Sequence, residues 1–545
     1  MTASKRLPDS LEPGMTRRRL LAGASGLGLA ACAGSLAIWR LVGSRGHLRA
    51  GATPSRSLGE AEDVQSGTKI RIGIAAGPVD LDPHTTTDLG DQQLLENIYR
   101  GLTVLNPETL SPVGEIAASW VVSSDELTWT FKLRPGVKFH NGRAVVADDV
   151  KFSLERILNP KLHASAAADL SPIGGIEVID SHTVALKLKN RYGILPVALQ
   201  EPAWSAIIPR EAVPNLGTKP VGTGPFQWVS QVPKTSVTLQ KFPDYWRKPL
   251  PYLAELDYQV IPDASDKLGA LLSKQVDFID SVPLALVAQV TNRSGITLVH
   301  FKSSWVNELG FNCRVKPFSD VRVRQAIAMA LNKNELAKAA TYGQGGPAQT
   351  MVASASPIKV NVKPLSYDPV RAKALLAEAG YPNGFSFSFS ACGGAAFPDM
   401  QSASELIAYQ LQAIGINATA PTMAAGVWVD NVITKHNYQG FICGLVSGLD
   451  PDQHLYRYFR SDGLYDFSQY ASTPTLDRLL IEGRETIDPG QRSKIYSQAC
   501  QMLADQVPWI PLYWLPGLVA MASEVHGFLP EPEFNLRFDT VRIQS

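Results

Sequence analysis

Two aspartates that lie close together in the C-terminal part of the chain are suited to chemistry. Asp450 and Asp452 flank Pro451, and a pair of carboxylates can act as a general acid and a general base. Aspartates around a proline also favour turns, because the side chain accepts hydrogen bonds from the backbone two residues on. Nothing else in the sequence requires the catalytic interpretation, so we expect turn chemistry here.

Other side chains that could bind a metal or attack a substrate are scattered. The nine histidines include no HExxH pattern, and no His/Cys cluster has the spacing of a zinc site. After residue 50 there is neither a GxxxxGK(S/T) phosphate loop nor a GxSxG nucleophile elbow. His140 stands beside an Asn-Gly turn and is expected to be an ordinary surface or strand-end histidine. We therefore expect no enzyme, no metal site and no cofactor.

Four of the five cysteines are separated by fifty or more residues. This spacing indicates neither a disulfide pairing nor a metal site, so we expect free buried thiols for most of them. These four are Cys313, Cys392, Cys443 and Cys500.

The N-terminal segment, residues 1–42, has the layout of a bacterial export signal. Arg17, Arg18 and Arg19 precede an apolar run, which is typical of a twin-arginine signal, and an ordinary Sec signal is the alternative. Leu29-Ala-Ala-Cys32 matches a lipobox, in which Cys32 would be acylated. The apolar run continues past Cys32, and about 20 apolar residues can span a bilayer, so an uncleaved anchor and cleavage to a soluble protein are the alternatives. All three place the body outside the cytoplasm, in the periplasm or at the cell surface.

The charge of the chain is unevenly distributed. The first fifty residues carry eight basic and two acidic side chains, and the remainder carries 43 basic and 48 acidic ones. A mildly acidic body has no electrostatic footprint for nucleic acid, so nucleic acid is excluded as a partner. With 545 residues the chain is too long for one ordinary core, and we expect two or more domains.

Strand and helix patterns alternate along the body. Residues 43–68 are a linker, of which 50–68 are small, polar and without period. Every second residue is apolar in 70–74 and 127–133, which predicts half-buried strands. Asp320 is expected to begin a helix, and Asp368-Pro369 to begin another that ends at Gly380. This mixture predicts an α/β protein with mixed sheets.

Several motifs of the body resemble the signature of family 5 extracellular solute-binding proteins, the dipeptide, oligopeptide and nickel receptors of ABC importers. They occur in the family's order across residues 70–530. The motifs that carry the resemblance are Leu81-Asp-Pro-His84, Ile116-Ala-Ala-Ser-Trp120, Leu127 to Gly142, Ala147 to Arg156, Pro220 to Phe226, Pro243-Asp-Tyr-Trp246, Ile261-Pro-Asp-Ala264, Phe318 to Ala326 and Val507 to Tyr513.

The resemblance implies a two-lobed periplasmic-binding-protein fold of type II, in the large peptide-receptor class. Lobe one would comprise residues 69–112, 225–311 and 512–545, and an inserted subdomain would comprise 113–224. Lobe two would comprise 312–511. A ligand would be trapped between the lobes when the hinge closes.

The resemblance also implies where ligand contacts lie. Peptide receptors place an Asp three residues before an Asp-Pro-Asp motif, where it pairs with the peptide's α-ammonium; here that position is Ser447, which Gly448 follows. A hydroxyl cannot neutralise a buried ammonium, so the solute should be neutral or blocked at that end, or held by another acid such as Asp88 or Asp450. The further candidates at the cleft are Thr86, Thr87, Trp305, Asn307 and Trp428.

The expected function is therefore that of the extracytoplasmic substrate-binding component of a peptide-type ABC importer. It would trap an oligopeptide or peptide-like solute and deliver it to a permease and ATPase complex, as a monomer tethered to the inner membrane by its N-terminal segment. The alternatives are an opine, an oligosaccharide or chelated nickel as the ligand, or a periplasmic chaperone or sensor, or an anchored hydrolase.

Overall fold

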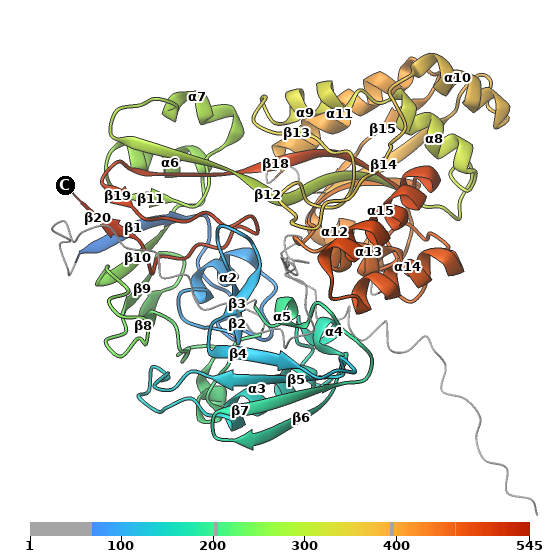
Figure 1. Ribbon diagram of the computed structural model, residues 1–545. Coiled ribbons are helices and arrows are strands. Elements are labelled where there is room, and N and C mark those ends of the chain that lie inside the picture. The colour runs from blue at the N-terminus through green and yellow to red at the C-terminus, as the bar shows by residue number, and fades with distance from the viewer. Residues whose placement is uncertain (1–67, 201–204, 393–396, 464, 545) are drawn as a thin grey trace, which may run out of the picture.

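The computed structural model describes residues 68–200, 205–392, 397–463 and 465–544. Cys32, the twin-arginine segment and the linker lie outside the described residues. Figure 1 shows three parts: the elements around β1 and β8–β11, the elements around α8–α15, and a lower part around β4–β7. The predicted α/β class and two-lobed fold are confirmed.

One twelve-stranded mixed sheet runs through both lobes. Its path is β15 (Asn417–Thr419), β14 (Ser386–Cys392), β17 (Gly440–Val446), β12 (Ile296–Phe311), β18 (Trp509–Ala522), β11 (Phe278–Ile279), β1 (Lys69–Ile74), β10 (Glu255–Val260), β9 (Ser236–Lys241) and β8 (Phe226–Val232). Off this path, β13 (Gly346–Pro347) pairs with β18 and β16 (Thr422–Met423) pairs with β14. The pairs β1–β10 and β14–β17 are parallel, whereas β12 is antiparallel to both β17 and β18.

The long strands β12 and β18 connect the two lobes. They span 16 and 14 residues and pair along most of their length. Figure 1 shows them passing side by side from the part around β11 to the part around β14. Every described side chain on β12 from Ser303 to Phe311 is buried. This half of the strand therefore lies in the interior of the protein.

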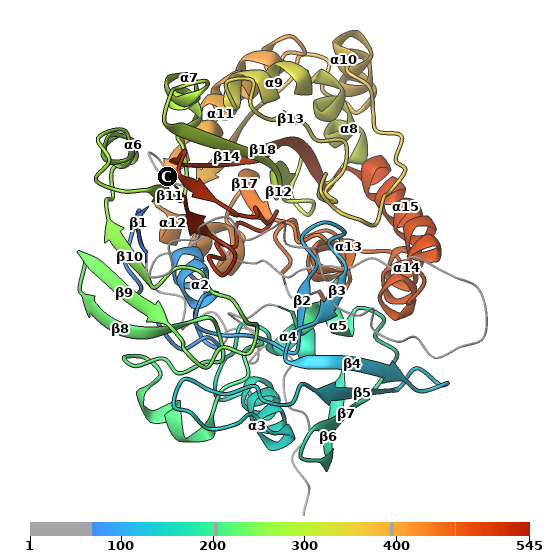
Figure 2. The same ribbon diagram turned by 60° about the vertical axis from the view of Figure 1, so that its left-hand side comes forward.

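Residues 113–224 contain a separate antiparallel sheet (Figure 2). Its order is β4 (Ala117–Val122), β5 (Thr128–Leu133), β7 (Thr183–Leu188) and β6 (Ile173–Asp180). The inward residues of the predicted strand 127–133 are buried in β5, whereas Lys132 is exposed. Two short pairs complete the sheets, β2 (Thr103–Leu105) with β3 (Pro112–Gly114) and β19 (Val525–His526) with β20 (Arg542–Ile543).

The helices begin at residues that can cap them. Asp320 accepts the backbone N–H of Arg322 at the start of α8, and Asp368 accepts that of Arg371 at the start of α10. Gly380 has φ of 94° just past the end of α10. The helices of lobe one and the subdomain are α2 (Leu89–Leu95), α3 (Ala147–Leu158), α4 (Ala167–Leu170), α5 (Leu195–Ala198), α6 (Ala264–Leu272) and α7 (Val287–Val290). Those of lobe two are α8 (Val321–Ala330), α9 (Lys333–Ala340), α10 (Pro369–Glu378), α11 (Pro398–Gln412), α12 (Ala425–Val429), α13 (Pro451–Phe459), α14 (Pro474–Glu485) and α15 (Pro489–Gln506).

None of the helices in the described ranges is long and apolar enough to cross a membrane. The four cysteines of the body are free, as the spacing predicted, and three of them are buried.

Candidate ligand site between the lobes

A single apolar cluster joins the inserted subdomain to both lobes. Buried residues of the subdomain, such as Leu195 and Ile207, belong to the same cluster as Trp305 of β12 and Met400 of α11. Half-buried aromatic side chains pack against it, among them Phe397, Trp514 and Phe534. The side chains at the place where the lobes meet are therefore mainly apolar, and several are aromatic.

Polar contacts also connect the inserted subdomain to lobe two. Arg457 of α13 forms an ion pair with Asp169 of α4, and both side chains are about nine-tenths buried. The backbone N–H of Gly193 donates to the carbonyl of Arg484 at 3.0 Å, and the Arg484 guanidinium lies over the ring of Tyr192 at 5.3 Å. The two parts thus contact each other through charged side chains and through the backbone.

Trp305 lies in the middle of this junction. Its ring centroid is 6.2 Å from that of Phe397 of lobe two and 6.3 Å from that of Phe534 in the C-terminal segment. The indole is only 7% exposed, and its Nε1–H has no hydrogen-bond partner in the described structure. An unmet buried donor costs free energy, so this group is available to a ligand.

Asn307, two residues further along β12, is fully buried. Neither its amide nitrogen nor its amide oxygen has a hydrogen-bond partner among the described residues. In the sheet it lies opposite Gly444 of β17 and Tyr513 of β18. A Cβ at Gly444 would come within 2.2 Å of Trp305 Nε1 and 2.7 Å of Asn307 Oδ1, which places these two orphan groups together over the glycine.

Asp399 reaches the same face of the sheet from the first turn of α11. The hydroxyl of Tyr513 donates to Asp399 Oδ2 at 3.0 Å, and the aspartate is 6% exposed. Burial raises the pKa of the Asp399 carboxyl, although the Tyr513 hydrogen bond and backbone N–H groups at the helix start act against this rise.

Ser447 and Gly448 lie at the end of β17, beside the junction. The Ser447 hydroxyl donates to the carbonyl of Ser304 at 2.8 Å, and the side chain is 3% exposed. Gly448 has φ of 67°, a conformation that glycine adopts without strain. The two residues turn the chain from β17 toward α13.

Asp450 and Asp452 form ion pairs within lobe two. Asp450 caps α13 by accepting the N–H of Asp452, and its oxygens lie 2.5 Å from the guanidinium nitrogens of Arg492. Asp452 pairs with Arg484 at 2.7 Å. The expected turn chemistry is present, and the Asp450 carboxylate is already neutralised.

The loop with Thr86, Thr87 and Asp88 is a helix-capping turn. Asp88 accepts the N–H groups of Gly90 and Asp91 at the start of α2, and the Thr86 hydroxyl donates to Asp91 Oδ2 at 3.0 Å. Thr87 is exposed.

Trp428 belongs to the core of lobe two and is fully buried. Its Nε1–H donates to the carbonyl of Ser390 at 3.1 Å, and its ring meets those of Phe441 and Phe467 edge-on. Of the predicted site residues, the structure brings together Trp305, Asn307, Ser447 and Gly448 and leaves Trp428 apart.

Sequence reasoning did not identify Phe397, Asp399, Tyr513 or Phe534 as site residues. Asp399 follows Pro398 and has the sequence context of an ordinary first-turn acid. Tyr513 stands inside an apolar strand motif and indicates core. No local signal separates these residues from structural ones.

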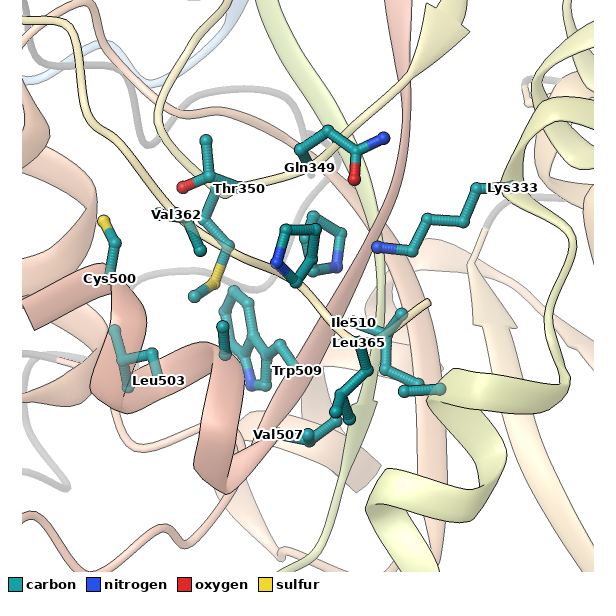
Figure 3. A pocket seen from close by; sticks show the side chains of 15 residues that line it. Lys333, Gln349, Thr350, Val362, Leu365, Cys500, Leu503, Val507, Trp509 and Ile510 are labelled. Carbon is teal, nitrogen blue, oxygen red and sulfur yellow. The ribbon is translucent and has the colours of Figure 1, made fainter. Parts of the chain in front are cut away.

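Two hollows lie outside this junction. Lobe two contains a cavity of about 30 Å³, into which Lys333 reaches from one side while Cys500 and Leu503 line the other (Figure 3). It is the size of one water molecule. A more open hollow of about 860 Å³ separates Glu126 and Arg191 of the subdomain from α14 and the start of α15.

The charged groups of the described residues form no metal site. No group of three or more His, Cys, Asp or Glu side chains in the ranges that the structure covers could hold a metal ion. Charged residues instead pair with one another, as in the buried network of Arg100, Arg247 and Arg537 with Glu115 and Asp539.

Known proteins resemble this chain along most of its length. The glutathione-binding protein GsiB of Escherichia coli O1:K1 / APEC is 28% identical over 488 residues, which are 87% of this chain and 94% of GsiB. The structure of AgaA from A. tumefacien R10, in complex with agropinic acid, has a TM-score of 0.75 and 29% identity and covers 88% of this chain and 99% of AgaA. The periplasmic binding protein DppA of Helicobacter pylori, in complex with the peptide STSA, has a TM-score of 0.75 and 25% identity over 88% of this chain and 99% of DppA.

The match to a described family runs from β3 through α13. Residues 111–466 match the family described as bacterial extracellular solute-binding proteins, family 5 Middle. The chain belongs to family 5 of the bacterial extracellular solute-binding proteins.

Proposed function

We propose that this solute-binding protein is the extracytoplasmic receptor of an ABC importer, and that it traps a small peptide or peptide-like solute between its lobes. The observation that carries the proposal is the junction around Trp305, where subdomain, lobe one and lobe two share one apolar cluster. Buried polar groups without protein partners stand in that cluster, at Trp305 and Asn307. Such groups fix the orientation of a ligand in an otherwise apolar site.

Two of the relatives suggest a size for the ligand. GsiB is named for glutathione, a tripeptide, and DppA was solved with a tetrapeptide. We therefore expect a solute of two to four residues' bulk. An opine is the second candidate, because AgaA was solved with agropinic acid and MoaA, 27% identical, with mannopinic acid.

The predicted site residues take two roles in this proposal. Trp305, Asn307, Ser447 and Gly448 would contact the solute or shape its pocket. Asp88, Thr86, Asp450 and Trp428 would hold the surrounding elements in place, since the described contacts of these side chains are caps, ion pairs and core packing. Thr87 is exposed beside them.

The finer predictions about the cellular context form part of the same proposal. The body would be exported, processed or anchored through residues 1–42 with Cys32 as the acylation site, and would act as a monomer without catalysis. Intact-mass analysis of the protein from membranes, compared with a Cys32→Ser variant, would reveal acylation by the loss of the lipid mass in the variant.

The receptor function is tested with protein purified without denaturation. Native mass spectrometry should show a bound small solute, and calorimetry of the stripped protein should show micromolar or tighter binding of glutathione, a short peptide or an opine. If no solute is retained and none of the three classes binds, the proposed function is wrong. Hydrolysis of the bound solute would indicate the anchored hydrolase instead.

A further inference from the structure

The carboxylate of Asp399 is a buried acid without a basic partner at the place where the lobes meet. Its exposure is 6%, and its one side-chain hydrogen bond in the described structure comes from Tyr513, a neutral group. No Lys, Arg or His side chain of the described residues forms an ion pair with it, and burial raises its pKa. The N-terminal end of α11 stabilises a negative charge only partly.

Other buried aspartates near the junction each have a cation. Asp450 pairs with Arg492, Asp452 with Arg484, and Asp169 with Arg457. Burying a carboxylate is costly unless a positive charge accompanies it. Asp399 therefore departs from the pattern that the rest of this region follows.

Independent groups on β12, which pairs with the strand of Tyr513, also lack partners among the described residues. The amide of Asn307 is fully buried with both its nitrogen and its oxygen unpaired, and the Trp305 Nε1–H is unpaired. Asn307 lies opposite Tyr513 in the sheet, and Tyr513 donates to Asp399. Tyr513 thus connects the Asp399 carboxylate to the strand that carries Asn307 and Trp305. We call these four residues the patch.

The patch lies where the cluster of the junction meets the core of lobe two, to which Tyr513 belongs. Phe397, two residues before Asp399, contacts the ring of Trp305. Met400, the residue after Asp399, belongs to the cluster that includes the inserted subdomain. A second buried acid, Glu308, follows Asn307 on β12, but it lies 3.5 Å from His454 of α13 and thus has a basic neighbour.

We propose that Asp399 is the counter-ion for a cationic nitrogen of the bound solute, and that Asn307 and Trp305 Nε1 bind the polar groups beside that nitrogen. The inference rests on the proposed function and deepens it, because it selects solutes that carry an ammonium or guanidinium group. It also supplies the acid that the serine at position 447 lacks: the charge comes from the start of α11 instead of the end of β17.

The test uses reduced glutathione and trialanine as probes, each also in its N-acetylated form. Calorimetry at neutral pH with the full-length stripped protein should show that acetylation weakens binding of the probe that the protein takes by at least about 30-fold, because a buried charge pair loses one partner. This comparison needs no variant. Equal affinity for the free and the acetylated probe would overturn the inference.

The variant Asp399→Asn keeps the shape of the side chain and removes its charge. Affinity for the free probe should fall by a similar factor of at least about 30, while affinity for the acetylated probe should change little. The unfolding midpoint of the solute-free variant should stay equal or rise, since an uncompensated charge is removed; a structural role would lower it. Asp368→Asn is the matched control, because asparagine also caps α10 well and Asp368 is exposed at the start of that helix.

Each result separates this inference from the receptor function. If the wild-type protein binds a probe and Asp399→Asn binds it equally well, the inference is wrong and the receptor function stands. If the retained solute proves by mass to contain no basic nitrogen, the inference is likewise wrong. If nothing binds and nothing is retained, both fail.

Discussion

At the scale of single residues, the acids of this protein differ in what neutralises them. Asp450 and Arg492 are both fully or almost fully buried and lie 2.5 Å apart. Burial lowers the pKa of the Arg492 guanidinium, but the nearby Asp450 charge and hydrogen-bonded neighbours outweigh burial and raise this pKa overall. Asp399 accepts from the Tyr513 hydroxyl and from backbone N–H groups, and none of the described Lys, Arg or His side chains forms an ion pair with it. We therefore expect the Asp450 carboxylate to stabilise the fold and the Asp399 carboxylate to bind the ligand.

We predict that Asp450→Asn destabilises the fold strongly. The change leaves the buried Arg492 guanidinium without its counter-ion, and breaking a buried pair on one side costs about 3–5 kcal/mol. Urea unfolding followed by tryptophan fluorescence should show this loss. Asp320→Asn, at the exposed start of α8, should change stability by less than about 1 kcal/mol; equal losses in the two variants would contradict the assigned role of the pair.

At the scale of elements, β12, β17 and β18 form the face that presents the site. Strand pairing places Asn307 between Gly444 and Tyr513, and the helix α11 brings Asp399 onto the hydroxyl of Tyr513. Gly444 matters because its missing side chain leaves the space that the Trp305 indole occupies.

We predict that Gly444→Ala displaces Trp305 and lowers both stability and ligand affinity. The new Cβ would lie 2.2 Å from Trp305 Nε1 and 2.7 Å from Asn307 Oδ1, and overpacking of this kind costs about 1–3 kcal/mol. Thermal unfolding and tryptophan fluorescence would measure the change.

Gly269→Ala is the matched control for this substitution. Gly269 lies within α6, and a Cβ there would meet no atom within 4 Å. Because alanine favours helix over glycine, the variant should gain roughly 0.5–1 kcal/mol. A Gly444→Ala protein that matched the wild type in stability and binding would refute the close packing over this strand.

At the scale of the whole molecule, polar contacts link the inserted subdomain to lobe two. Arg457 and Asp169 are 288 residues apart in sequence and form a buried ion pair. The backbone bond between Gly193 and Arg484 lies in the same interface. We expect these contacts to help hold the inserted subdomain against lobe two.

We predict that Asp169→Asn shifts the molecule toward an open form. The Arg457 guanidinium would lose its charged partner between α4 and α13, which favours separation of the two parts and hydration of the arginine. Small-angle scattering should show a larger radius of gyration than that of the wild type, and ligand should dissociate faster. Arg478→Gln, which removes an exposed pair with Glu482, should leave the radius of gyration and the rate of ligand dissociation unchanged. An unaltered scattering curve for Asp169→Asn would contradict the role proposed for the Asp169–Arg457 ion pair.

The fold could be predicted because its signals are local. Alternation over 127–133, the Asp-Pro start of α10 and Gly380 beyond its end all specify elements through neighbouring residues. The start of α3 is less well defined by the sequence, because two acids that could cap a helix, Asp148 and Asp149, are adjacent. The helix starts at Ala147, and Asp149 accepts the N–H of Val146 from inside the first turn. Helix ends depend on such small differences in backbone bonding.

The sequence by itself determined the α/β class and the family, because these follow from periodic patterns and from motifs in a fixed order. Only the tertiary structure decided which polar groups have partners. Asp450 meets Arg492 across 42 residues, and Tyr513 meets Asp399 across 114. Pairings over such distances depend on how helices and strands pack, and no local pattern records them. For that reason the sequence offers Asp450 as a candidate acid for the ligand, whereas nothing in it marks Asp399, a buried acid with no ion pair in the described structure.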